Sequence, residues 1–391
     1  MLVVLIMVLA AVQLLRGVPT QRISYAATIT VTVPGSDALP WPSSGEAAVS
    51  LGGNSIVRTA GLQRPVPIAS LAKMMTALIV LRDHPLTAQD DGPNIAITPA
   101  DVTTYQQDVA AEDSVLPVQA GEVLTERQAL EGLLLPSADN VADVLADWDA
   151  GSVSDFLTKM NDTAKALGMT ETTYTDPSGL AATTVSTALD QLRIETAAMA
   201  NPVFATIVSL PSATFPVGGT LENYDFDVGH DGIIGVKTGS DSAAQGCWAF
   251  AANRQIGGSM RPVYGVVLGI PSTSLGLLEP ALSAGLALAN AIPGTIRDQV
   301  VLPAGTVVGH VVAPWRSPVA LRTTKAVSGL VLAGQTITVH VTATAPSGKT
   351  VRSGIVVGSV SSMQVSGTSG SSVVTSTSGG GPSLWWRLTR L

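Results

Sequence analysis

Ser70 and Lys73 are the residues of this sequence whose types and spacing point most directly to covalent chemistry. They begin and end the stretch Ser70-Leu71-Ala72-Lys73, and on a helix this spacing puts the hydroxyl and the amine on one face, one turn apart. A serine hydroxyl is a weak nucleophile until a base takes its proton, and a lysine serves as that base only if burial or another cation lowers its pKa. The apolar residues that follow supply the burial, so the pair predicts a serine nucleophile with a lysine base.

Two further polar motifs follow this pair along the chain. Pro136-Ser137-Ala138-Asp139-Asn140 ends an expected helix, and Gly235-Val236-Lys237-Thr238-Gly239-Ser240 lies on an expected strand. The Ser-x-x-Lys pattern alone occurs by chance in many proteins. The ordered set of Ser-x-x-Lys, a Ser-x-Asn type element and Lys-Thr-Gly is far rarer. It is typical of enzymes that form an acyl-enzyme on their own serine.

The scarcity of lysine supports the role of Lys73. The chain has six lysines beside fifteen arginines, and two of the six, Lys73 and Lys237, lie in these motifs. Arginine does not lose its proton in proteins, so a base at this position has to be a lysine. The count says less about Lys237, whose expected role needs only a positive charge.

The pattern around the first motif predicts a helix buried inside a domain. From Ser70 to about His84, apolar residues surround most of the expected helix. Helix-start signals occur at Thr98-Pro99, with proline at the first helical position, and at Thr125 with Gln128, which have capping-box spacing. Further helices are expected over residues 152–167, 186–200 and 275–291.

Strands are expected before and after this helical section. They are predicted at residues 46–51, 55–60, 235–238, 248–252 and 263–268, with Gly52-Gly53-Asn54 as the turn of an early hairpin. The sequence therefore predicts an α+β domain over residues 45–293. Its antiparallel sheet is covered by helices, and the helical section is inserted between early and late strands.

The segments outside residues 45–293 carry no chemical motif. Residues 1–20 start with an apolar run that ends at Arg16, and they predict a signal or anchor segment that sends the chain across a membrane. Residues 21–44 predict an irregular lead-in, and residues 294–360 a small all-β domain. Residues 361–391 predict a flexible Ser/Gly linker and a Trp/Arg tail, which suits a membrane surface or an acidic partner, or has no role.

Composition excludes some classes of function. The net charge of -8 is spread along the chain without a basic block, so no nucleic-acid partner is expected. Cys247 lies in an apolar run and is expected to be buried packing. Neither a metal nor a cofactor is predicted, because the four histidines are scattered and lack partners at metal-ligand spacing: His84, His230, His310 and His340.

From about Gly45 to Pro293, the sequence resembles the serine-type D-Ala-D-Ala carboxypeptidases, the low-molecular-mass penicillin-binding proteins of peptidase family S11. Beyond the three motifs, the resemblance includes Pro67-Ile68-Ala69, Ala120-Gly121-Glu122 and Asp176-Pro177-Ser178-Gly179-Leu180. It implies a β-lactamase/transpeptidase-like fold and a site of action in the bacterial cell envelope. It also implies peptidoglycan stem peptides as substrates and β-lactam antibiotics as acylating inhibitors.

The resemblance implies catalytic roles for three residues. Ser70 attacks the carbonyl between the two D-alanines and forms an acyl-enzyme, while Lys73 takes its proton. Ser137 relays a proton toward the leaving amine. Water then releases the acyl group.

The resemblance also implies a substrate-binding role for the strand motif. Lys237 and Thr238 hold the terminal carboxylate, in a segment that continues through Gly239 and Ser240. The backbone N–H groups of Ser70 and Ser240 form the oxyanion hole, where two fixed donors stabilise the developing negative charge.

One position departs from the family pattern. Where the family has Asn two residues after the second serine, this chain has Asp139, and Asn140 follows one step later. One step on a helix rotates a side chain by about 100°, so Asn140 substitutes only if the backbone is irregular. If Asp139 faces the site instead, its carboxylate favours the charged form of Lys73 and weakens it as a base. We expect a working enzyme with altered substrate contacts from Asp139 and Asn140.

Two alternatives remain open on the sequence alone. A β-lactamase shares the three motifs but hydrolyses its acyl-enzyme with a glutamate on a separate loop, and Glu171 has no recognisable context of that kind. An inactive wall-binding homologue would keep the fold and lose activity through Asp139. The intact Ser70, Lys73, Ser137 and Lys237 argue against it.

Overall fold

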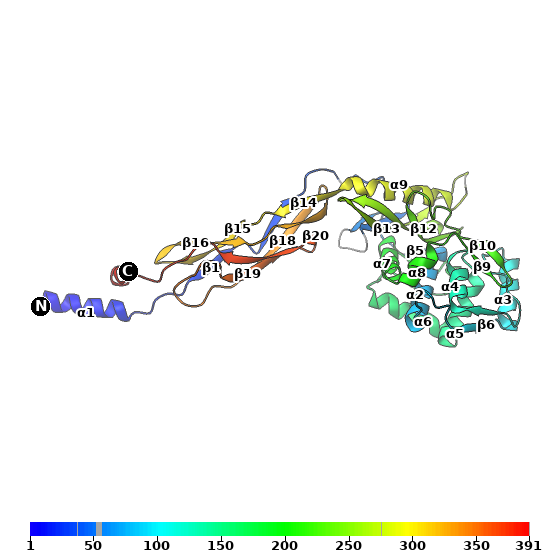
Figure 1. The fold of residues 1–391 in the computed structure, drawn as a ribbon, viewed down its shortest axis with the longest axis horizontal. Coiled ribbons are helices and arrows are strands. Elements are labelled where there is room, and N and C mark those ends of the chain that lie inside the picture. Colours follow the sequence, from blue (N-terminus) through cyan, green and yellow to red (C-terminus); the bar gives the residue numbers. More distant parts are fainter. Residues whose placement is uncertain (37, 52–56, 275, 391) are drawn as a thin grey trace. The chain divides into compact units, whose positions relative to one another are not determined.

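The structure divides into two units that differ in secondary structure (Figure 1). It is a computed structural model that describes residues 1–36, 38–51, 57–274 and 276–390. One unit consists of residues 38–294 and combines a sheet with helices, and the other joins residues 1–37 to residues 295–391 and is mostly β. All three chemical motifs lie in the first unit.

A five-stranded antiparallel sheet carries the Lys-Thr-Gly motif. Its order is β11-β12-β13-β3-β4, so the two early strands pair with the late ones through β13 and β3. The bounds are β3 Glu46–Leu51, β4 Val57–Ala60, β11 Ile233–Asp241, β12 Gln245–Ile256 and β13 Ser259–Ile270. The expected strands are confirmed, whereas the predicted turn Gly52-Gly53-Asn54 and Ser55 lie outside the described residues.

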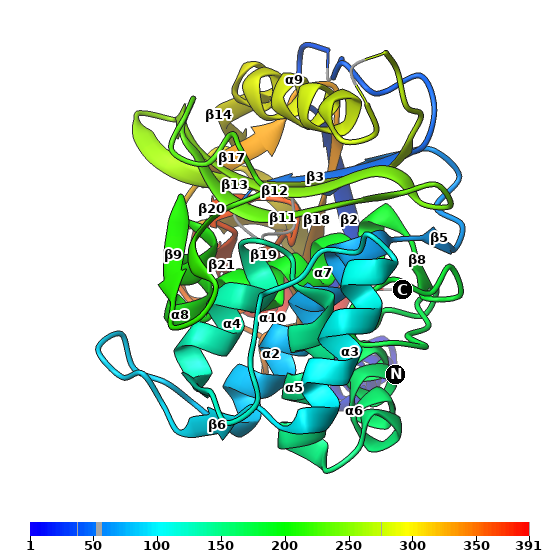
Figure 2. The ribbon, with the colours of Figure 1, turned by 90° about the vertical axis from the view of Figure 1, so that its right-hand side faces the viewer.

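Helices cover both faces of this sheet, as Figure 2 shows. On one face lies α9 (Glu279–Thr295), where Gly285 is so close to Trp248 that an added Cβ would stand 2.4 Å from the indole ring. On the other face lies α7 (Ala188–Met199). β12, the second strand in this order, is therefore buried on both sides, and Cys247 is a free, buried side chain within it.

The remaining helices form a cluster around α2 (Lys73–Asp83), whose residues are almost all buried. The cluster consists of α3 (Pro99–Ala110), α4 (Glu126–Leu134), α5 (Asp139–Ala150), α6 (Val153–Ala166) and α8 (Pro202–Val208). Capping boxes start α3 at Thr98 and α4 at Thr125, as predicted. Together, sheet and cluster confirm the predicted α+β fold.

Three two-stranded pairs connect these elements. They are β5 (Val66–Pro67) with β8 (Val185–Ser186), β6 (Asn94–Ala96) with β7 (Val123–Thr125), and β9 (Ser212–Phe215) with β10 (Gly219–Glu222). The first pair has a direct bearing on the chemistry, because β5 leads straight into Ser70.

The β unit contains a seven-stranded and a three-stranded sheet around a valine-rich core. The larger sheet has the order β1 (Arg22–Tyr25), β15 (Val307–Ala313), β16 (Arg316–Thr323), β21 (Gly370–Thr375), β19 (Val356–Ser361), β18 (Thr336–Ala343) and β2 (Thr28–Thr32). The smaller one has the order β14 (Ile296–Leu302), β17 (Val327–Leu332) and β20 (Ser366–Thr368).

Two segments that were predicted to be irregular contain strands of this unit. The lead-in over residues 21–44 contains β1 and β2, and the linker over residues 361–391 contains β20 and β21. The prediction of irregular structure was wrong here, because it gave more weight to the Pro, Gly and Ser content than to short runs in which apolar and polar residues alternate. In β2, Ile29 and Val31 pack against the core, and in β21 Val373 is fully buried in it. The β unit is thus larger than the predicted 294–360.

The first and last helices of the chain lie against each other within the β unit. The Arg390 guanidinium of the segment after α10 (Leu384–Thr389) donates to the carbonyls of Gln13 and Arg16 at the end of α1 (Leu2–Leu15), at 3.1 and 2.7 Å. Trp386 packs edge-on against Trp315 with ring centroids 5.7 Å apart. Within the described ranges, we find no helix with both the length and the apolar character that a membrane crossing requires.

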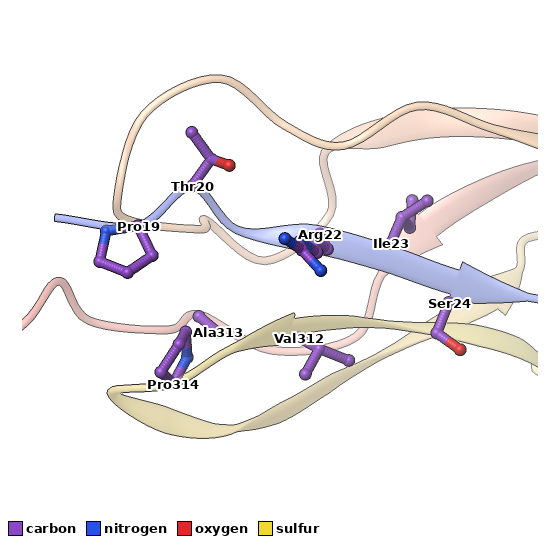
Figure 3. Close-up of a pocket in the computed structure, with 8 residues that line it drawn as sticks. All are labelled: Pro19, Thr20, Arg22, Ile23, Ser24, Val312, Ala313 and Pro314. Atoms are coloured by element: carbon purple, nitrogen blue, oxygen red, sulfur yellow. The ribbon is translucent and has the colours of Figure 1, made fainter. Parts of the chain in front are cut away.

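A hollow of about 650 Å³ opens at the β1 edge of this unit, between β1 and β15 (Figure 3). Its lining includes Arg22, Ile23 and Val312, and prolines stand at its end. None of its lining residues belongs to the motifs predicted to carry chemistry.

Candidate active site

Ser70 lies on a short 3₁₀ turn, η1 (Ala69–Ala72), which runs directly into α2. Ala69 before it has a φ of +46°, a left-handed conformation that is strained for a residue with a side chain. The turn is held on one side by Gly179, where a Cβ would stand 1.8 Å from the Ala69 carbonyl oxygen. The half-buried Ser70 therefore faces the surface from a turn fixed by its surroundings.

Lys73 is fully buried, and three acceptors surround its amine. Its Nζ lies 2.8 Å from Ser70 Oγ, 2.5 Å from Asp139 Oδ1 and 3.0 Å from the carbonyl oxygen of Ser178. As an ammonium, Lys73 donates one proton to each acceptor. As a neutral amine, it can donate to Asp139 and Ser178 and keep its lone pair for the Ser70 proton. This geometry fits a base in both of its protonation states.

The backbone at Ser137 decides which of Asp139 and Asn140 reaches the site. Ser137 has a φ of +63°, so the chain turns sharply before α5 begins at Asp139. Asp139 points to Lys73, whereas the Asn140 amide clamps the backbone of Leu116, accepting from its N–H and donating to its carbonyl at 3.0 Å each. Asn140 therefore does not replace the family's asparagine, and its predicted place in substrate binding is corrected. The carboxylate of Asp139 occupies the position.

Ser137 and Lys237 form the second pair of the site. The Lys237 ammonium donates to Ser137 Oγ and to the Thr238 carbonyl, both at 2.9 Å. Burial, and in second place the positive charge of Lys73, lowers the pKa of Lys237 to about 7. The motifs thus form two hydrogen-bonded pairs, Lys73 with Ser70 and Lys237 with Ser137, and the two lysines are close enough for the charge of one to affect the other.

The Lys-Thr-Gly strand lies against the nucleophile turn. A Cβ on Gly239 would stand 3.0 Å from the Ser70 backbone nitrogen, so glycine allows β11 to approach η1 this closely. Because β11 stands at one end of the strand order, its outer edge lies beside the site, and Thr238 and Gly239 line the same hollow as Ser70. Ser240, which is exposed, lines it too.

The hollow above Ser70 has a volume of about 230 Å³. Sequence reasoning missed four of its lining residues, namely Ser114, Tyr224, Phe226 and Leu278. It also missed the carbonyl of Ser178, although the motif that contains it was noted. No grouping of three or more histidine, cysteine or acidic side chains suited to a metal ion occurs in the described part of the chain.

The alternation of residues 223–226 explains how two aromatic rings reach the hollow. Asn223 and Asp225 point inward, and Asp225 accepts from the Trp248 indole N–H at 2.9 Å. Tyr224 and Phe226 consequently point outward, and the Tyr224 N–H is bound to the Leu135 carbonyl at 3.0 Å. No motif would have marked these rings, because aromatic residues in a loop are usually packing.

Comparisons with known proteins agree with this geometry. The family model described as D-alanyl-D-alanine carboxypeptidase matches residues 47–272, more than half of the chain. The chain is 37% identical to the D-alanyl-D-alanine carboxypeptidase DacB2 of Mycobacterium tuberculosis, over 52% of this chain and 67% of the relative. It is 34% identical to the D-alanyl-D-alanine carboxypeptidase of Streptomyces sp. strain K15, over 53% and 72%.

Solved structures give the same result. The Streptomyces K15 DD-transpeptidase is similar with a TM-score of 0.56 and 29% identity, covering 65% of this chain and 98% of that one. A D-alanyl-D-alanine carboxypeptidase of Mycobacterium tuberculosis gives a TM-score of 0.55 and 32% identity, covering 66% and 94%. This chain belongs to the D-alanyl-D-alanine carboxypeptidase family, peptidase family S11.

Proposed function

We propose that this protein removes the terminal D-alanine from peptidoglycan stem peptides through an acyl-enzyme on Ser70. The observation that carries the proposal is the distance of 2.8 Å from Lys73 Nζ to Ser70 Oγ, in a hollow that also contains Thr238 and Gly239. Family membership adds the substrate class, since relatives with this site are named for the D-alanyl-D-alanine bond.

Acylation starts with proton transfer from Ser70 Oγ to the neutral amine of Lys73. The oxygen attacks the carbonyl between the two D-alanines, and the N–H groups of Ser70 and Ser240 stabilise the oxyanion. When the C–N bond breaks, Ser137 gives its proton to the leaving amine and takes up the proton that Lys73 received from Ser70, and D-alanine departs. Water then attacks the ester and gives a proton to the neutral amine of Lys73, which passes it to Ser70 Oγ as the ester C–O bond breaks and the shortened peptide leaves.

Binding of the substrate's terminal carboxylate falls to Lys237 and Thr238. A buried cation beside a hydroxyl suits a carboxylate, because a low local dielectric strengthens the attraction. Asp139 and Asn140 differ in this scheme. Asp139 accepts a hydrogen bond from the base, while Asn140 keeps the segment around Leu116 in place.

The protein acts outside the cytoplasm, at the cell envelope, and associates with a membrane surface through its terminal helices. Support comes from α1, which is apolar except for Gln13 and has no buried residue, and from Trp385, which is 76% exposed beside Arg387. Tryptophan and arginine favour the lipid headgroup region. Sedimentation with vesicles containing anionic lipid tests this. We expect Trp385→Ser to weaken binding several-fold, and an unchanged bound fraction would contradict it.

Reaction with benzylpenicillin tests the proposed chemistry. After incubation, the intact mass should show a lasting adduct that is absent in Ser70→Ala, and a short peptide ending in D-Ala-D-Ala should release D-alanine. Rapid turnover of penicillin without an adduct would instead indicate a β-lactamase. A folded protein that forms no adduct and releases no D-alanine would indicate an inactive wall-binding homologue.

A further inference from the structure

The loop Asp176–Leu180 lies directly behind the catalytic lysine, although neither the motifs nor the proposed mechanism gives it a role. Two consecutive carbonyls of this loop bind side chains of the first turn of α2. The Ser178 carbonyl accepts from Lys73 Nζ at 3.0 Å, and the Pro177 carbonyl accepts from Thr76 Oγ1 at 2.7 Å. Ser178, Lys73 and Thr76 are all buried. The position of the loop therefore determines one of the three partners of Lys73.

A single carboxylate, that of Asp176, organises the loop. Its Oδ2 accepts from the N–H groups of Gly179 and Leu180 at 2.6 and 2.9 Å, from the Ser178 hydroxyl at 2.8 Å and from the Ser178 N–H at 3.3 Å. Its Oδ1 accepts from the hydroxyl of the buried Thr184. Five donors thus converge on a carboxylate that provides about four lone-pair sites, and four of these donors share Oδ2.

The same loop supports the nucleophile. Gly179 has a φ of +92° and seats its backbone on the Ala69 carbonyl with no room for a Cβ, and Ala69 directly precedes Ser70. A displaced loop would thus disturb both partners of the proton transfer. Such a transfer depends strongly on alignment, because a misplacement of about 1 Å can cost roughly a hundredfold in rate.

We infer that Asp176 is a positioning residue for Lys73, which holds the Ser178 carbonyl where it accepts one amine proton so that the lone pair points at Ser70. The second N–H of the neutral amine donates a hydrogen bond to Asp139, which belongs to a different element, α5. The inference rests on the proposed function. The titratable groups facing Lys73 are Asp139, Lys237 on β11, and Asp108 and Asp113 in and after α3.

The test compares Asp176→Asn with Asp190→Asn. Asp190 is a matched control, because it is a buried carboxylate that accepts from the N–H of Glu171 and the hydroxyl of Thr172 in the preceding loop without touching Lys73. The readouts are the melting temperature and the rate constant of acylation by benzylpenicillin from pH 5 to 9.

We expect both variants to lose thermal stability, but only Asp176→Asn to alter the pH profile. Its plateau should fall about tenfold or more because the lone pair is misaligned. The rate constant of Asp190→Asn should keep the wild-type plateau, because the loop behind Lys73 is intact in that variant. An Asp176→Asn profile with the shape and plateau of the wild type would overturn the inference.

A second variant covers the case in which Asp176→Asn fails to fold. Thr184→Val keeps the volume of a fully buried side chain and removes the hydrogen bond that the Thr184 hydroxyl donates to Asp176 Oδ1. It also removes the bonds that this hydroxyl accepts from the N–H groups of Thr175 and Asp176, which belong to the same end of the loop. It should shift the profile in the same direction by a smaller amount, and a wild-type profile here would count against the role of Asp176. A wild-type enzyme that forms no adduct would overturn the proposed function itself. Failure of the proposed function can therefore be told apart from failure of the role inferred for Asp176.

Discussion

Asp139 Oδ1 and Lys73 Nζ lie 2.5 Å apart in a buried ion pair, at the position where relatives of this enzyme were expected to have an asparagine. The carboxylate accepts a hydrogen bond from Lys73 but cannot donate one, whereas an asparagine amide can do both. Asp139 therefore holds one N–H of the amine whose Nζ also lies 2.8 Å from Ser70 Oγ, and it does so as a charged acceptor.

Replacing Asp139 by asparagine should keep an acceptor for Lys73 and remove the negative charge. We expect Asp139→Asn to be acylated by penicillin faster at neutral pH, by about tenfold, because a neutral amide oxygen holds the amine less strongly than a carboxylate does. The second-order acylation rate constant between pH 5 and 9 measures this. Asp101→Asn, at the exposed start of α3, is the control. If acylation of Asp139→Asn matches the wild type at every pH, Asp139 has no influence on the base.

Lys237 should make substrate capture weaker at alkaline pH. Burial and Lys73 lower the pKa of its ammonium to about 7, so above this pH the free enzyme loses the cation that meets the substrate carboxylate. For a peptide ending in D-Ala-D-Ala, kcat/KM should fall by up to about tenfold per pH unit above 7. The pH profile of kcat should lack this alkaline limb. A peptide amide without the carboxylate should lack this limb, and an identical limb for both substrates would exclude Lys237 as its cause.

Gly239 should tolerate no side chain. The Cβ of Gly239→Ala would stand 3.0 Å from the Ser70 nitrogen and from Leu71 Cδ1, so η1 and β11 must separate. Because oxyanion stabilisation depends on fixed donors, we expect acylation to fall by about a hundredfold. Circular dichroism and melting temperature serve to show that the fold persists. Gly258→Ala, in the turn between β12 and β13 with open space around the glycine, is a control for the sheet.

Asp143 on α5 should reduce stability as the pH rises. Burial raises the pKa of its carboxyl to about 7, with further contributions from Asp108 and Asp147. Its folded-state pKa lies above the unfolded one, so stability is lost as the pH rises from about 4 through 7. Asp143→Asn should raise the melting temperature by roughly 4 °C or more at pH 8 and hardly at pH 4. Asp147→Asn, exposed on the same helix, removes only a smaller contribution to this pKa shift and should raise the melting temperature at pH 8 far less than Asp143→Asn does.

Sequence reasoning selected residues that the structure brings together where the expected chemistry restricts residue type. Ser70 with Lys73 and Ser137 with Lys237 form hydrogen-bonded pairs, and the proposed roles of nucleophile, base and carboxylate-binding cation each require a particular side chain. The choice between Asp139 and Asn140 could not be predicted. It depends on the left-handed conformation of Ser137, whose hydroxyl is bound to Lys237, 100 residues away.

The contributions of the backbone to the site and to the β unit could not be predicted from the sequence either. The acceptor that Ser178 offers to Lys73 is a carbonyl, which every residue type has, so only the position of the loop reveals it. In the β unit, β2 pairs with β18 about 300 residues later, at Ile29 with Val339. Such short strands owe their stability to distant partners rather than to local propensity, so local composition gave the wrong answer.

The order of strands in the β unit has a consequence for biosynthesis. Residues 38–294 are contiguous, so the enzymatic unit can fold while the rest of the chain is still being translated. The β unit cannot, because β1 and β2 are made first and β21, which lies between β16 and β19, is made among the last. The first strands must therefore wait for nearly the whole chain to leave the ribosome before their sheet can close.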